Sequence, residues 1–110
     1  MRFHSIPSPD AEADIDSASR WYQQIDPNLA FRFTMETFET LRRIERFPYQ
    51  FPVIEGTTRR ALLKHFPYSI FFTLNNEGPF VIAVVHQRRS DVVWMDRATG
   101  ASERGPYDRQ

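Results

Sequence analysis

The sequence lacks cysteine, has only four glycines and contains no long apolar run. Without cysteine, disulfide bonds and thiolate metal sites are excluded. Four glycines leave no glycine-rich loop of the kind that cradles phosphates. No stretch is long enough to span a membrane, and residues 1–14 lack the apolar core of a signal peptide. These absences predict a cytoplasmic protein without a membrane partner.

The chain also lacks net charge, because 14 basic residues balance 14 acidic ones. Residues 1–58 hold six basic and nine acidic residues, whereas residues 59–97 hold six basic and three acidic ones. Thirteen of the 14 basic residues are arginine, whose planar guanidinium group suits phosphate and carboxylate recognition. The second half is therefore a candidate binding face, although a genome-wide preference for arginine explains the same count.

The first half of this single 110-residue domain shows helical patterning after a short strand predicted at residues 2–6. Ser8 and Pro9 suit the cap and first position of a helix over residues 9–25, whose apolar positions recur every three or four residues. Asp26 and Pro27 repeat that signal and start a second helix, which runs to about residue 47. Because the junction is so short, the two helices form an antiparallel hairpin.

The second half changes to strand patterning, with strands predicted at residues 58–66, 68–74 and 80–86. The last of these is a continuous apolar run, typical of a strand covered on both faces. A short helix is predicted from Ser90, and the polar tail at 98–110 is expected to be disordered or partly ordered. The predicted fold is α+β, a helical hairpin packed on a mostly antiparallel, twisted four-stranded sheet within residues 1–97.

Several segments match one known family in order and in spacing. They are residues 9–22, 27–33, 66–72 and 83–86, with Ile44, Pro48, Arg60, Arg89, Trp94 and Arg97. On these residues the chain resembles the RelE/ParE superfamily of type II toxins, and within it the ParE-like, plasmid-stabilisation branch. The resemblance implies a toxin that inhibits growth by binding DNA gyrase, needs no cofactor and does not itself bind DNA sequence-specifically. It also implies a cognate antitoxin, a small, partly disordered protein with a DNA-binding N-terminal part.

The RelE-like branch implies a different mechanism, ribosome-dependent cleavage of mRNA. That chemistry needs groups that activate a ribose hydroxyl, stabilise a phosphorane and protonate the leaving oxygen. Arg60 and Arg88 stand where the nucleases have basic residues, but Leu62, Ser69 and Trp94 replace the other groups. Tryptophan has no titratable proton and cannot act as the general acid. The substitutions therefore favour a protein-binding inhibitor over an enzyme.

Two histidines keep the nuclease alternative open. His65 and His86 each end a predicted strand, and if adjacent they would form an acid–base pair together with Arg60 and Arg88. A structural, hydrogen-bonded role for His86 is the other interpretation. A metal site needs more ligands than these two residues, so none is expected.

Two binding surfaces are predicted. Phe31, Met35 and Phe38 lie on a broad apolar arc of the second helix and are the candidate antitoxin site, although core packing explains the same pattern. Target contact is assigned to four residues, namely Arg60, Arg88, Arg89 and Trp94. The three arginines converge near Trp94 if their segments share one sheet, unless Asp91 and Asp96 neutralise them locally. A non-toxic relative, kept as a regulatory partner of the antitoxin, is a third possible function.

Overall fold

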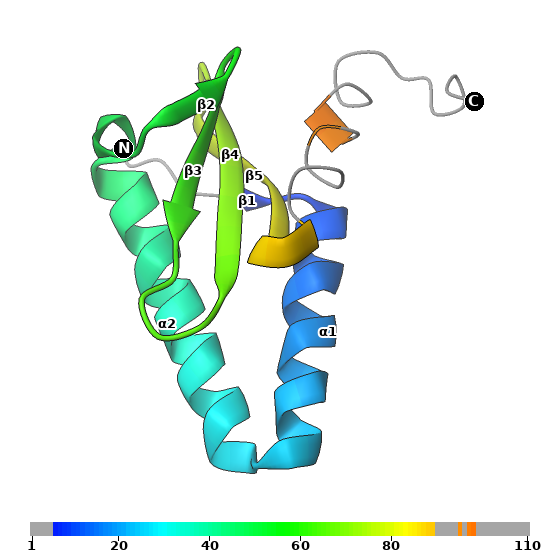
Figure 1. Ribbon diagram of the computed structural model, residues 1–110. Helices are drawn as coiled ribbons and strands as arrows, with labels where there is room; N and C mark the ends of the chain where they lie inside the picture. Colours follow the sequence, from blue (N-terminus) through cyan, green and yellow to red (C-terminus); the bar gives the residue numbers. More distant parts are fainter. Residues whose placement is uncertain (1–5, 90–94, 96, 99–110) are drawn as a thin grey trace, which may run out of the picture.

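The computed structural model of the chain describes residues 6–89, 95, 97 and 98. Two helices cover one face of a five-stranded sheet (Figure 1). In chain order the elements are β1 (Ile6–Pro7), α1 (Pro9–Ile25), α2 (Pro27–Arg46), η1 (Pro48–Gln50), β2 (Val53–Glu55), β3 (Thr58–Leu62), β4 (Tyr68–Asn75), β5 (Gly78–His86) and η2 (Gln87–Arg89). The sheet order is β1-β5-β4-β3-β2, with β1 parallel to β5 and the other neighbours antiparallel. The predicted α+β fold is confirmed, and the structure adds β2 as a short edge strand.

The helical hairpin begins at the residues that the sequence indicates. The Ser8 hydroxyl accepts a hydrogen bond from the Ala11 N–H at 3.0 Å, and Pro9 occupies the first turn of α1. Asp26 ends α1 and caps α2, where its carboxylate accepts the Asn28 N–H at 3.0 Å. Each cap satisfies a donor that has no partner within its helix. The predicted helix boundaries are confirmed to within one residue.

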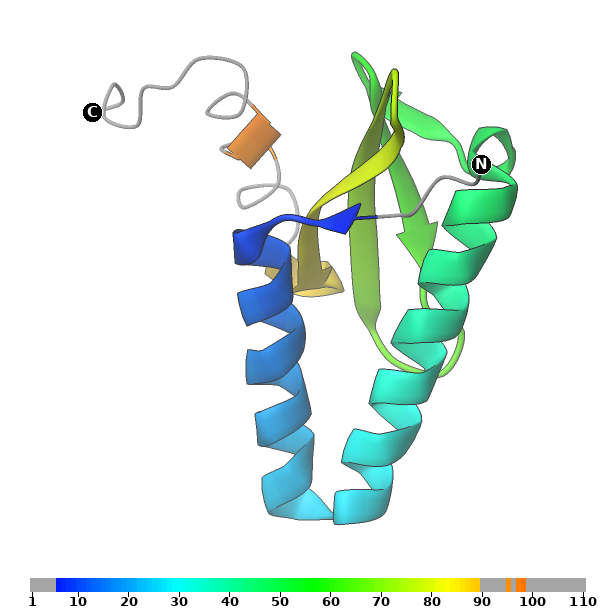
Figure 2. The same cartoon turned by 180° about the vertical axis from the view of Figure 1, so that it is seen from behind.

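An aromatic cluster fills the space between the hairpin and the sheet. The rings of Tyr22, Phe33, Phe66 and Tyr68 lie 5.1–6.3 Å apart, mostly edge to face. Ala11 and Ala18 are buried beside them, so α1 packs closely on the sheet. Seen from behind, the strands are visible between the two helices, and the junction of the helices extends beyond the sheet (Figure 2). Side chains near that junction therefore lie beyond the strands that the structure describes.

The opposite face of the sheet carries a second buried cluster. Phe71, Ile82, Ala83 and Val85 form it, and Ala98 from the C-terminal segment packs against it. The run at residues 80–86 is thus buried on both faces, as its sequence predicts. Met95, Arg97 and Ala98 are helical. The remainder of the predicted C-terminal helix, residues 2–5 of the predicted first strand, and residues 99–110 of the predicted tail lie outside the described residues.

Candidate functional site

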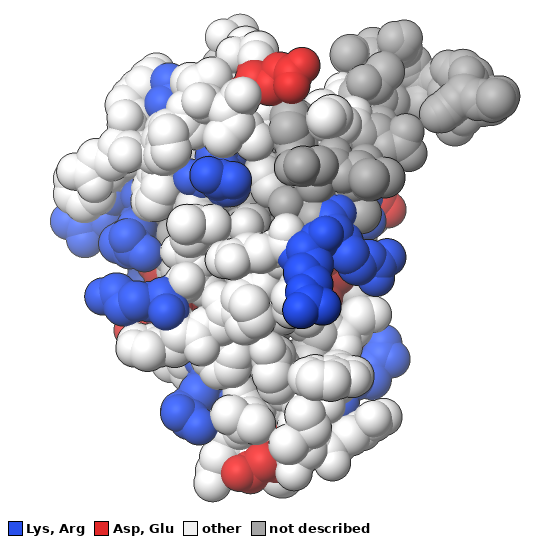
Figure 3. Space-filling view, in the orientation of Figure 1, with Lys and Arg blue, Asp and Glu red and all other residues white. Residues whose placement is uncertain are grey.

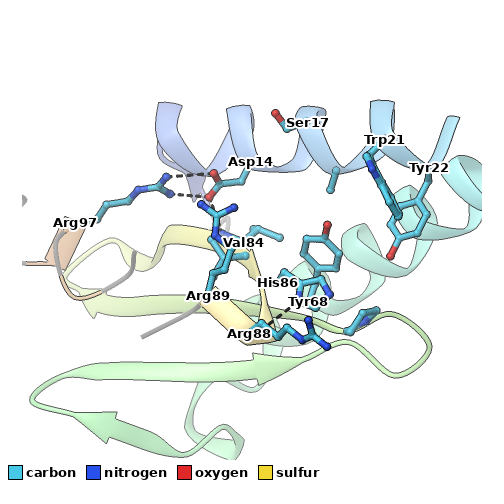
Figure 4. Close-up of a pocket in the computed structure, with 13 residues that line it drawn as sticks. Asp14, Ser17, Trp21, Tyr22, Tyr68, Val84, His86, Arg88, Arg89 and Arg97 are labelled. Atoms are coloured by element: carbon cyan, nitrogen blue, oxygen red, sulfur yellow. Dashed lines mark hydrogen bonds and ion pairs between the residues drawn. The ribbon is translucent and has the colours of Figure 1, made fainter. Parts of the chain in front are cut away.

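A cleft of about 880 Å³ opens between α1 and the C-terminal end of β5. Trp21 and Tyr22 of α1 form one wall, and Tyr68 and His86 form the other (Figure 4). Tyr68 and His86 face each other across β4 and β5, which brings the start of one strand beside the end of the next. Because η2 follows directly, the cleft collects side chains from segments far apart in the sequence.

One end of the cleft is closed by an ion pair between Asp14 and Arg97. The guanidinium group contacts both carboxylate oxygens, at 2.6 and 3.2 Å, and also donates to the Ile82 carbonyl at 3.2 Å. The carboxylate accepts the Val84 N–H as well, at 2.9 Å. A bidentate pair of this kind fixes the relative orientation of the two side chains and neutralises their charges. Asp14 therefore ties the C-terminal segment to β5, a role that the sequence did not reveal, since Asp14 is separated from Val84 by 70 positions.

The opposite end of the cleft combines an imidazole and two phenols. The His86 ring packs edge-on against Tyr68, with centroids 5.3 Å apart. His86 Nδ1 accepts the Arg88 N–H at 3.2 Å, so the neutral ring carries its proton on Nε2. Burial raises the pKa of Tyr68 above 10.0, and the Arg89 guanidinium opposes part of that rise. Burial, and then the neighbouring Tyr68, also raise the pKa of Tyr22. Both phenols thus remain protonated donors at neutral pH.

Arg88 and Arg89 give the cleft its excess positive charge. Both are exposed, and neither forms an ion pair with any residue that the structure describes. Arg97 adds a third positive charge, but Asp14 offsets it. Uncompensated cations at the rim of a concave site raise the local concentration of anionic partners. The cleft is therefore suited to an acidic or phosphate-bearing group.

Comparison with known proteins assigns the chain to a family. A family model described as "ParE toxin of type II toxin-antitoxin system, parDE" matches residues 6–91. The chain belongs to the ParE toxin family. Among solved structures, a chain of the "Chromosomal ParDE TA system from P. aeruginosa" is similar, with 18% identity and a TM-score of 0.67. That match covers 76% of this chain and 96% of the other. No curated protein sequence matches.

In this ParE-family chain, the cleft unites some of the predicted target-contact residues and not others. Arg88 and Arg89 line it, whereas Arg60 does not. Arg60 lies in β3 opposite Phe71, a residue of the buried cluster on the face of the sheet away from the helices. Trp94 lies outside the described residues. Within the described part of the chain, no helix is long and apolar enough to cross a membrane.

The two candidate acid–base histidines occupy different environments. His65 lies in the loop after β3, where its N–H and its Nδ1 contact the Glu36 carboxylate at 3.0 and 3.1 Å. The Lys64 N–H donates to the same carboxylate. His86 instead contacts Tyr68 and the backbone of Arg88. No hydrogen bond or ring contact between the two histidines is found among the described residues.

The candidate antitoxin residues lie on the exposed side of α2. Phe31, Met35 and Phe38 are 65%, 44% and 45% exposed. The core face of α2 is formed instead by Phe33, Thr37, Thr40, Leu41 and Ile44. The two threonines tolerate burial because their hydroxyls donate to carbonyls one turn earlier, at 2.8 and 2.9 Å. The core-packing alternative for the three apolar residues is therefore wrong, and they form a stripe of surface apolar groups.

Proposed function

We propose that this ParE-family protein arrests bacterial growth by binding DNA gyrase in the cytoplasm, and that a cognate antitoxin neutralises it. The observation that carries the proposal is the pair of exposed arginines at the rim of the cleft, Arg88 and Arg89, which form no ion pair within the described part of the chain. Family membership supplies the toxin assignment, and the arginines supply a surface for an acidic target. The nearby phenols add hydrogen-bond donors to the same surface.

The target contact extends from the cleft across the neighbouring surface. Arg60 lies two strands away from β5 and adds a further positive charge on the side of the sheet that the helices leave uncovered. Trp94 follows η2 in the sequence and is assigned to the same contact. Arginine and tryptophan are among the residues that most often dominate the binding energy of an interface.

The antitoxin is assigned to the stripe formed by Phe31, Met35 and Phe38. Their spacing of four and three residues places them on one line along α2. A partly disordered segment that folds into an amphipathic helix would cover such a line, because its apolar face replaces water over all three side chains. This contact uses no residue of the cleft.

Cleavage of ribosome-bound mRNA is the second candidate function. It is favoured by the position of a phenol and an imidazole, Tyr68 and His86, beside Arg88 in one cleft. It is disfavoured by Ser69, which is buried, and by Leu62, which has no polar side chain. The raised pKa of Tyr68 also keeps its phenol from acting as a base near neutral pH. A non-toxic role in an antitoxin complex is the third candidate.

Induced expression in bacteria without antitoxin separates these functions. The test variant combines Arg88→Ala with Arg89→Ala, which leaves the backbone N–H bond to His86 in place. The matched control combines Arg20→Ala with Arg32→Ala, which removes the same two charges from exposed helix positions. We expect growth arrest with a DNA-damage response from the wild type and the control, but not from the test variant. Translation arrest with cut mRNA supports the nuclease instead, and normal growth of cells that contain folded wild-type protein supports the non-toxic role.

A further inference from the structure

Three arginines stack on aromatic rings near the C-terminal end of α2, beside η1 and the β2–β3 edge of the sheet. The guanidinium carbon of Arg43 lies 5.7 Å from the centroid of the Phe51 ring. The corresponding distances are 5.5 Å for Arg46 over Phe47 and 5.1 Å for Arg59 over Tyr49. These six residues are the arginine–aromatic cluster, and all three distances are within the range of cation–π contacts.

The fold assembles this cluster from two separate segments. Arg43 and Arg46 lie in the last turn of α2, and the three rings follow within and beside η1. Arg59 arrives from β3, and its guanidinium group donates to the Phe51 carbonyl at 2.7 Å. The Arg60 N–H donates to the Pro52 carbonyl at 3.1 Å and holds β3 against the same segment. The guanidinium groups are therefore positioned by the fold before any partner binds.

The cluster has uncompensated charge although the whole chain is neutral. Residues 42–60 contain five arginines and two glutamates, a net charge of +3. None of Arg43, Arg46 and Arg59 forms an ion pair with a described residue. Figure 3 shows basic side chains gathered along the edge formed by α2. Stacking on a ring occupies the flat face of a guanidinium group and leaves its N–H edge available for bidentate contact with an anion.

Two of the three rings of the cluster are open to solvent as well, whereas Phe51 is half-buried and packs against the core. Tyr49 is 77% exposed and Phe47 is 47% exposed. Since Arg59 covers one side of Tyr49, the opposite side of the ring remains accessible. We propose that the arginine–aromatic cluster binds single-stranded nucleic acid, with the guanidinium groups on phosphates and the open rings under bases. A positively charged surface interleaved with aromatic rings is suited to single-stranded nucleic acid, because every base offers a flat face and every nucleotide a phosphate. An acidic protein segment would pair with the guanidinium groups, but it would leave the exposed rings without a flat partner to stack on.

This site is distinct from the cleft and from the apolar stripe, although Arg59 is the sequence neighbour of Arg60, a residue of the proposed target contact. It shares no residue with the cleft or with the stripe at Phe31, Met35 and Phe38. Nucleic-acid binding is therefore measurable on the purified full chain whether or not gyrase is the target. Recognition through phosphates and base faces is independent of sequence, so it adds no sequence-specific DNA binding to the toxin.

The test is fluorescence anisotropy of labelled 12-nucleotide oligothymidylate and oligouridylate, titrated with the full chain at several salt concentrations. A site that neutralises three phosphates gives a slope of log K against log salt of about −2. Arg43→Ala and Arg46→Ala should each make that slope shallower by about 0.7. Tyr49→Ala should weaken binding roughly 5- to 150-fold with an unchanged slope, since it removes one stacked base, whereas Tyr49→Phe should bind like the wild type.

Two comparisons test whether the oligonucleotide binds at the arginine–aromatic cluster and whether its bases contribute. Because Arg88 and Arg89 line the cleft and not the cluster, the double change Arg88→Ala and Arg89→Ala should weaken oligonucleotide binding less than the single change Arg43→Ala does. Polyglutamate should compete poorly against oligothymidylate at equal charge. Circular dichroism establishes that each variant is folded. Absence of binding at low salt, loss of binding in the cleft variant, full competition by polyglutamate, or a folded Tyr49→Ala variant with wild-type affinity would each overturn the proposal. A duplex that binds more tightly than the single strands would also contradict it.

Discussion

Removing the carboxylate of Glu36 should release the loop between β3 and β4 from α2. Glu36 is the acceptor for the N–H groups of Lys64 and His65 and for the His65 ring. Its side chain is only 14% exposed, so water does not replace it freely. A hydrogen bond to a charged group contributes about 1.5–3 kcal/mol, and the exposed loop offsets part of the total. We expect Glu36→Ala to lower the free energy of unfolding by about 2 kcal/mol, which lowers Tm by about 9 °C.

The same contact should depend on pH. Burial alone would raise the pKa of Glu36, but hydrogen bonds from the His65 and Lys64 backbone and from the His65 ring outweigh it and lower that pKa below 4.5. A carboxyl group with a lowered pKa in the folded state stabilises the protein above its unfolded pKa. That contribution is lost as the pH falls through the folded pKa. The stability difference between the wild type and Glu36→Gln should therefore be largest at pH 7 and shrink below about pH 4.5.

Chemical denaturation at pH 7, 5 and 3 measures both effects. The matched control is Glu39→Gln, which removes the same charge from an exposed position on the same helix and should change stability by less than about 0.5 kcal/mol. A Glu36→Ala variant as stable as the control would refute the role assigned to these hydrogen bonds. A difference between wild type and Glu36→Gln that stays constant from pH 7 to pH 3 would refute the charged-acceptor argument.

Two further predictions concern the cleft and the apolar stripe. A double-mutant cycle with Asp14→Ala and Arg97→Ala, followed by thermal unfolding, should give a coupling energy of about 1–3 kcal/mol, because the bidentate pair is mostly shielded from solvent; purely additive effects would contradict this. Phe38→Ser should change stability by less than about 0.5 kcal/mol yet weaken antitoxin binding at least 10-fold in calorimetry, because the ring is exposed in the free toxin. Wild-type antitoxin affinity would remove Phe38 from the interface.

The parts of the fold that the sequence predicts well depend on local signals. Ser8 with Pro9 and Asp26 with Pro27 place two helix starts correctly, because a cap and a first-turn proline act within a few residues. The turn between β4 and β5 is also local, and there the Glu77 N–H donates to the Asn75 side chain at 2.8 Å. β2 was missed because three residues are too few to show a period.

Contacts between distant segments were not predictable from spacing. Glu36 accepts hydrogen bonds from a loop that begins 28 positions later in the chain, whereas helical spacing indicates only partners within its own helix. The spacing of Phe31, Met35 and Phe38 likewise fits a core stripe, whereas burial of Thr37 turns α2 so that Phe31 is exposed. A threonine that bonds its own helix behaves as a core residue, and the sequence alone does not reveal that bond.

The proposed contact with gyrase depends on Arg88 and Arg89. The direct measurement is DNA supercoiling by purified gyrase in the presence of the purified full chain. We expect inhibition by the wild type and by the Arg20→Ala, Arg32→Ala control, relief on adding the cognate antitoxin, and at least 10-fold weaker inhibition by the Arg88→Ala, Arg89→Ala variant. Undiminished supercoiling at saturating wild-type toxin, or equal inhibition by the folded double variant, would contradict it.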